Sequence, residues 1–126
     1  MKKPLKIRYE EAAELPNNPV FTTKDIMEIF HFSSQATAQR FDKNGLVNAK
    51  KNKNGHRYYS YNQIEYMKKL QKLVDYDFSI FSIKTLIEFE KSKGRDAALY
   101  LEEFADFYTK RRYSANRNNK RKQKNG

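Results

Sequence analysis

The fold is decided by residues 21–60, which read FTTKDIMEIFHFSSQATAQRFDKNGLVNAKKNKNGHRYYS. Near the start of this stretch, Thr22 can cap a helix, because a threonine hydroxyl accepts one of the unpaired backbone N–H groups. Ile26, Ile29 and Phe30 follow at the i, i+3 and i+4 spacing that gives a helix one apolar face. These residues predict a short amphipathic helix.

A second short helix is expected directly after the first one. Ser33 or Ser34 can cap it, and we expect it to run to about Lys43. Ala38 and Phe41 give it an inward face, and an Asn-Gly pair then ends it. Two short helices joined by so few residues must cross steeply, which is the helix-turn-helix arrangement.

The next segment, Val47–Tyr59, is expected to form a β-hairpin that we call the wing. It is polar and rich in Lys and Asn, and Asn54–Gly55 lies near its centre. An Asn-Gly pair accepts the positive φ angles of a tight hairpin turn. The sequence therefore predicts a mostly α-helical fold of the winged helix-turn-helix type.

Three more helices are expected after the wing. Ser60 with Gln63 forms a capping box for the first of them. The second is expected from Ser79 to about Lys91, and the third from about Asp96 to Arg112. The first two would support the helix-turn-helix from behind, and the C-terminal helix would pair two copies.

The two ends of the chain are expected to differ from the middle. The arm before Phe21 contains a mixed-charge patch from Tyr9 to Leu15 that can make a short helix before Pro16. Residues 110–126 contain eight Lys or Arg and no acid, so they cannot bury enough apolar area to order themselves. The expected organisation is an N-terminal arm (1–20), a winged helix-turn-helix domain (21–91), a C-terminal helix (95–112) and a disordered basic tail (113–126).

The composition indicates a polyanionic partner. Lys and Arg number 26 against 15 Asp and Glu, so the formal net charge is +11. Such a charge attracts nucleic acid. A membrane surface fits less well, because the basic tail has no apolar face, and no apolar stretch is long enough for insertion. We therefore expect a soluble, cytoplasmic protein without membrane insertion.

The positive charge is concentrated on the second helix and the wing. Between Ser33 and Tyr59, six Lys or Arg oppose Asp42 alone, which gives a local balance of +5. Each phosphate neutralised by such a surface releases counterions and so favours binding. Double-stranded DNA is the expected partner.

Four groups of residues together form a recognisable pattern: Phe21–Thr22–Thr23 through Phe32–Ser33, then Thr37, Phe41, Asp42, Gly45 and Leu46, then Asn54 through Ser60, and Asp77–Phe78–Ser79–Ile80 with Ile83. They resemble the DNA-binding half of the MerR family of transcription regulators, over roughly residues 21–90. The resemblance implies that the second helix enters the major groove. It also implies that the wing holds backbone phosphates through Arg57 and Tyr59. Excisionases and other small accessory proteins of mobile elements share this plan.

The candidate DNA contacts come from the second helix and the wing. Gln and Arg have the fork geometry that reads adenine and guanine edges, so Gln39 and Arg40 are expected base readers. Tyr58 and Tyr59 alternate across a strand, so one of the two is expected in the core. The full set of expected contacts is Ser34, Gln35, Thr37, Gln39, Arg40, Lys43, Lys50, Lys51, Lys53, His56, Arg57 and Tyr59.

No catalytic, metal or cofactor site is expected. The chain has no Cys, which excludes disulfides, thiolate catalysis and thiolate metal sites. His31 and His56 are far apart and have no acidic cluster at ligand spacing. No Gly-rich phosphate loop or Ser-His-Asp arrangement stands out. We therefore expect a binding protein and not an enzyme.

The sequence leaves the biological role between three hypotheses. The leading one is a transcription regulator, in which the aromatic C-terminal helix packs on the fold or joins two copies into a homodimer. The second is an accessory role on a mobile element, in excision, plasmid maintenance or conjugative transfer. The third is a protein-interaction adaptor whose charge only keeps it soluble. The aromatic residues of the C-terminal helix are Tyr100, Phe104, Phe107 and Tyr108.

Overall fold

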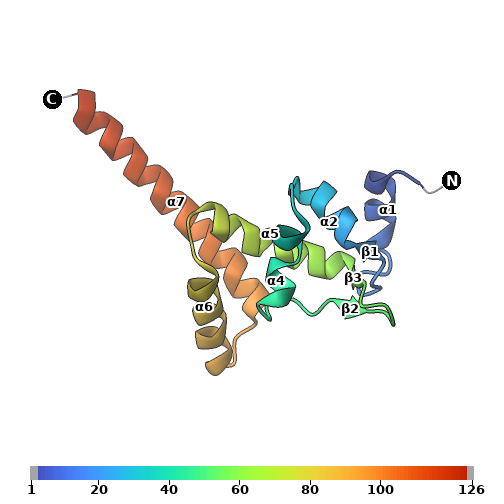
Figure 1. The fold of residues 1–126 in the computed structure, drawn as a ribbon. Helices are drawn as coiled ribbons and strands as arrows, with labels where there is room; N and C mark the ends of the chain where they lie inside the picture. Colours follow the sequence, from blue (N-terminus) through green and yellow to red (C-terminus); the bar gives the residue numbers. More distant parts are fainter. Residues whose placement is uncertain (1–2, 125–126) are drawn as a thin grey trace. The chain divides into compact units, whose positions relative to one another are not determined.

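The computed structural model describes the backbone of residues 3–124 and the side chains of residues 3–115. It consists of two compact units, residues 1–68 and residues 69–126. Helices dominate, with a small antiparallel sheet, which confirms the expected winged helix-turn-helix (Figure 1). The elements are α1 (Leu5–Ala12), β1 (Phe21–Thr22), α2 (Thr23–Phe30), α3 (Gln35–Ala38), α4 (Arg40–Lys43), β2 (Lys50–Lys51), β3 (Arg57–Tyr59), α5 (Tyr61–Asp75), α6 (Ile80–Ser92) and α7 (Ala97–Lys124).

The first motif helix, α2, begins at the predicted cap. The Thr22 hydroxyl accepts the Asp25 backbone N–H at 3.2 Å, and the Asp25 carboxylate accepts the Thr22 N–H at 3.0 Å. This reciprocal capping box satisfies two N–H groups at the helix start. The helix ends at His31, whose left-handed φ of 59° turns the chain toward the second helix.

The second motif helix starts at Ser34, as expected, but it is not continuous. Gln39, with φ −96° and ψ 1°, interrupts it, so the predicted single helix consists of the short segments α3 and α4. This backbone conformation lies between the regular helix and extended regions. Gly45 then ends the motif with φ +75°, a conformation that costs glycine little.

The sheet has the strand order β1-β3-β2, with both pairs antiparallel. β2 and β3 form the predicted wing, and Gly55 takes φ +78° in its turn. β1 was not predicted, because two residues are too few to show the alternating pattern of a strand. Its pairing of Phe21 with Tyr59 joins the start of the motif to the base of the wing.

One core lies beneath the motif helices and the sheet of the first unit. The predicted inward residues Ile26, Ala38 and Phe41 are all buried in it. The same burial extends along α5, where Ile64 and Met67 lie three residues apart on one face of the helix. The remaining buried apolar residues of this unit are Phe21, Val47 and Tyr59.

Within the first unit, the N-terminal arm packs against the starts of α2 and α5. Its helix α1 lies a few residues earlier than the expected 9–15. The Tyr9 ring lies 5.7 Å from the Phe21 ring and 4.9 Å from the Tyr61 ring, centroid to centroid. Both guanidinium ends of Arg8 donate to the Asp25 carboxylate, at 3.1 and 3.3 Å. The arm is therefore fastened to the capped start of α2.

The second unit is built from α6, α7 and the end of α5. Apolar residues of all three helices are buried in it. Phe78 packs edge-on against Phe104 and Tyr108 at 5.7 and 5.0 Å, so two of the expected aromatic residues are packing residues. The buried set is Leu70, Leu73, Ile83, Ile87, Leu101 and Ala105.

The last helix is longer than the sequence predicted. We expected it to end near Arg112 and to be followed by a tail without regular structure, whereas the backbone is helical to Lys124. Between Gly94 and Gly126 the sequence contains no Gly or Pro that would stop a helix. The Asp96 carboxylate also caps the helix start by accepting the Leu99 N–H at 3.0 Å. The last two residues of the predicted tail lie outside the described residues.

Candidate nucleic-acid interface

The outer face of α3 and α4 carries three of the expected contact residues. Gln35 and Lys43 are exposed and Thr37 is half-buried, opposite the buried Ala38 and Phe41. The Ser34 hydroxyl is occupied by the helix cap, since it accepts the Thr37 N–H and lies 2.8 Å from the Thr37 hydroxyl. The Gln35 amide and the Lys43 ammonium are therefore the most exposed of these polar groups.

Gln39 does not lie on that face, so the expectation that its side chain faces outward was wrong. Only 7% of the residue is exposed. Its side-chain amide donates to the Thr23 hydroxyl of α2 at 3.3 Å. The break at Gln39 turns its side chain between the two motif helices, where it joins them.

Arg40 is half-buried beside two aromatic rings. Its guanidinium carbon lies 4.9 Å from the centroid of the Phe41 ring and 5.9 Å from that of Phe32. A guanidinium over a ring face is attracted by the ring quadrupole. The stacking fixes the direction of this charge at the surface of the motif.

The wing presents its lysines openly. Lys50, Lys51, Lys53 and His56 are all exposed, as expected. The turn that carries them is organised by Asn52, whose side-chain oxygen accepts the backbone N–H groups of residues 54 and 56 at 3.0 and 2.9 Å. The basic tip is thus ordered by its own side-chain hydrogen bonds.

Tyr59 is fully buried and so is the core residue of the Tyr58–Tyr59 pair, whereas the family resemblance implied that it meets a phosphate at the surface. Burial raises the pKa of its phenol to about 12, so the side chain stays neutral. Within the part of the chain that the structure describes, its hydroxyl has no hydrogen-bond partner. Tyr58 is the half-buried residue of the pair and lies on the opposite face of the strand.

Arg57 is paired with Asp42, a contact that the sequence did not predict. Its Nε donates to Asp42 Oδ2 at 2.5 Å, and the two side chains are only 18% and 8% exposed. The pair joins β3 of the wing to α4 of the motif. The signal was present in the sequence, since Asp42 is the single acid between Ser33 and Tyr59.

A cleft of about 300 Å³ separates the motif helices from the wing. It brings Gln35 of α3 together with two consecutive residues of the wing, His56 of the turn and Arg57 of β3, that lie about 20 residues later in the chain. It also adds Lys24, which the sequence did not suggest and which is exposed near the start of α2. The other lining residues are Thr22, Thr23, Gln39, Gly55 and Tyr58.

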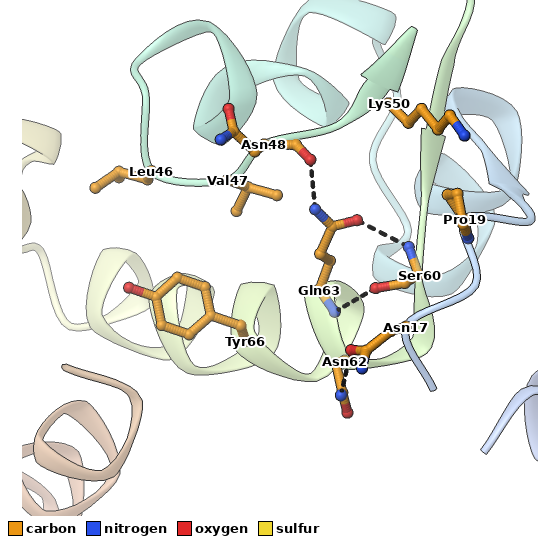
Figure 2. A pocket seen from close by; sticks show the side chains of 10 residues that line it. All are labelled: Asn17, Pro19, Leu46, Val47, Asn48, Lys50, Ser60, Asn62, Gln63 and Tyr66. Atoms are coloured by element: carbon orange, nitrogen blue, oxygen red, sulfur yellow. Dashed lines mark hydrogen bonds between the residues drawn. The ribbon is translucent and has the colours of Figure 1, made fainter. Parts of the chain in front are cut away.

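A larger hollow of about 580 Å³ lies on another side of the wing. Figure 2 shows Gln63 of α5 at its centre, bonded both to the Ser60 backbone and to the Asn48 carbonyl. The bonds to Ser60, at 2.9 and 3.1 Å, form the predicted capping box. The other lining residues are Asn17, Pro19, Leu46, Val47, Lys50, Asn62 and Tyr66.

Comparison with known families identifies this arrangement. A family model described as the MerR HTH family regulatory protein matches residues 21–90, more than half of the chain. The chain belongs to the MerR family. No curated protein and no solved structure matches it. The matched MerR segment runs from β1 to the last turn of α6 and so contains both motif helices and the wing.

MerR membership defines the kind of activity: the chain is a DNA-binding protein of the transcription-regulator type, a family that is typically not enzymatic. Among the described residues, no three His, Asp or Glu side chains gather where a metal ion could bind. Within residues 3–124, no helix combines the length and apolar character needed to cross a membrane. The arm and all of α7 lie outside the MerR match.

Proposed function

We propose that this MerR-type protein binds a preferred double-stranded DNA sequence, with α3 and α4 in the major groove and the wing on the flanking backbone. The observation that carries the proposal is the exposed surface that Lys43 and the wing lysines form. This surface contains almost no acidic side chain. Asp42 is the only acidic residue in residues 33–59. Its side chain is only 8% exposed and forms an ion pair with Arg57. Such a surface favours phosphates through counterion release.

Gln35 is the favoured base reader in this docking. It is exposed at the first turn of α3, and it lines the cleft between the motif and the wing. A glutamine amide can pair with both polar groups on the major-groove edge of adenine. Gln35 thus takes the role that the sequence assigned to Gln39.

We further propose that two copies pair through α7. Leu99 and Phe107 are 57% and 64% exposed, which leaves apolar area without cover in a single chain. The helix is acidic in residues 97–109 and carries eight Lys or Arg and no acid in residues 110–124. In an antiparallel pair of α7 helices, the acidic half of each helix would lie beside the basic half of the other. Two of the acids, Glu102 and Asp106, also form ion pairs with lysines of α5 in their own chain. A Phe107→Lys variant should sediment as a monomer if this pairing holds.

Footprinting across the DNA around the protein's own gene tests the main proposal. A protected promoter supports regulation of transcription, and a protected origin or recombination site supports an accessory role on a mobile element. Sequence-specific binding should weaken steeply with salt, with a log–log slope of roughly −5 to −9 for about 6–10 phosphate contacts. Weak binding that ignores sequence would instead support the adaptor hypothesis and contradict the proposal.

A further inference from the structure

One peptide group at the root of the wing is held from both sides. The Ala49 N–H donates to Asp42 Oδ1 of α4 at 3.2 Å. The carbonyl of the same peptide, that of Asn48, accepts the Gln63 side-chain amide of α5 at 2.5 Å (Figure 2). The chain enters β2 directly after this peptide. The direction in which the wing leaves the domain is therefore fixed by two side chains.

Asp42 also reaches the other strand of the wing. Its second oxygen, Oδ2, accepts Arg57 Nε at the start of β3. One carboxylate thus joins α4 to both wing strands, through Ala49 on one side and Arg57 on the other. A hairpin this short has little stability of its own, so such external contacts decide its orientation.

The wing orientation matters because binding uses two surfaces at once. The lysines of the wing and the outer face of α3 and α4 must meet one duplex in the same encounter. A mobile wing would have to be ordered on binding, which costs conformational free energy that a fixed wing does not lose. Asp42 would then favour binding because it keeps the wing in place, even though its negative charge is repelled by the DNA phosphates.

We propose that Asp42 is a positioning residue for DNA binding, which sets the wing relative to the motif helices without touching DNA. This inference rests on the proposed duplex binding. It opposes the simple electrostatic expectation, in which the loss of an acid at the interface strengthens binding. It also assigns Arg57 chiefly to the same junction and not to a phosphate.

The test compares Asp42→Ala with Glu14→Ala, an exposed acid of the arm that gives the same change in net charge. Fluorescence anisotropy with a footprinted duplex should show about tenfold weaker binding for Asp42→Ala and a change within twofold for Glu14→Ala. The salt slope should become shallower by about two units, because the wing lysines lose their placement. Equal or tighter binding by Asp42→Ala would overturn the proposal.

Two additional variants separate positioning from loss of folding. The double variant Asp42→Ala/Arg57→Ala should bind within about twofold of Asp42→Ala, because both residues act through one junction. Gln63→Glu keeps an acceptor for the Ser60 N–H but loses the donor to Asn48, so it should weaken binding while α5 stays folded. Additive losses in the double variant would mean that Arg57 contacts phosphate separately, and would contradict the assignment.

Amide hydrogen exchange tests the junction without DNA. Ala49 should be protected in the wild-type protein and lose protection at least tenfold in Asp42→Ala, while the core of α5 keeps its protection. If the wild-type protein binds no duplex, the proposed function fails, and this measurement still decides whether the wing is fixed. Unchanged protection of Ala49 would overturn the junction itself.

Discussion

The second motif helix and the wing both carry polar and basic residues, but the fold uses them differently. In the second motif helix, Gln39 at the break is buried against α2 and Arg40 is stacked on aromatic rings, so few polar side chains face outward. On the wing, the lysines are exposed, and the residues withdrawn are Arg57 and Tyr59 at its base. We infer that the wing supplies most of the general affinity and that a small part of the helix supplies the preference for sequence.

The wing should dominate affinity. Replacing Lys51 and Lys53 by Gln should weaken binding to preferred and random duplexes alike by about 30-fold near physiological salt, and flatten the salt slope by about two units. The matched control replaces Lys3 and Lys6 of the arm, which changes the net charge equally. Anisotropy titrations over a salt series measure both quantities. Equal losses in the two double variants would show that net charge, and not the wing, determines affinity.

Gln35 should dominate sequence preference. Gln35→Ala removes the exposed amide of α3, so binding to the preferred site should fall by about 1–3 kcal/mol while random-sequence binding changes little. Competition between the two duplexes gives this ratio directly. If the ratio stayed at its wild-type value, the helix surface described above would not read bases.

Gln39 should act on stability and not on reading. Gln39→Ala breaks the bond to Thr23, which should lower the free energy of unfolding by about 1 kcal/mol and leave the site preference intact. Urea unfolding measures the first quantity and duplex competition the second. In the double variant with Thr23→Ala the two losses should not add, because both remove one hydrogen bond. If Gln39→Ala lost its preference for the specific site, Gln39 would be a base-contacting residue and this prediction would be wrong.

Tyr59→Phe should have the smallest effect at neutral pH. The lost hydroxyl is buried and has no partner among the described residues, so stability should change by less than about 0.5 kcal/mol and DNA binding by less than twofold. The variant should matter at high pH. The folded phenol has its pKa raised to about 12 from 10, so stability is lost as pH rises from about 10 to 12.

Tyr59→Phe should reduce that alkaline loss, which thermal unfolding at a series of pH values would record. Tyr58→Phe, on the other face of the strand, is the matched control. If Tyr59→Phe and Tyr58→Phe lost equal stability between pH 10 and 12, the buried Tyr59 phenol would not be the cause of the alkaline loss of stability.

Caps and turns were predictable because each depends on residues close together in the chain. The Thr22 cap, the capping box of Ser60 with Gln63, and Gly55 in its turn all act within a few residues, and all three are found as expected. The predicted end of α7 was wrong. The basic composition of residues 110–126 indicated disorder, but this segment contains no Gly or Pro before Gly126 that would stop the helix. β1 escaped prediction because its partner, β3, lies almost 40 residues away.

The sequence by itself determined the winged helix-turn-helix plan, the MerR resemblance and the concentration of charge on the wing, because periodicity, turn residues and charge can be counted along the chain. Only the tertiary structure decided which polar side chains remain at the surface. Gln39, Tyr59 and Asp42 acquire their roles from α2, the core and Arg57, respectively. A side chain's partners from other elements fix its exposure, and neighbours in sequence do not specify them.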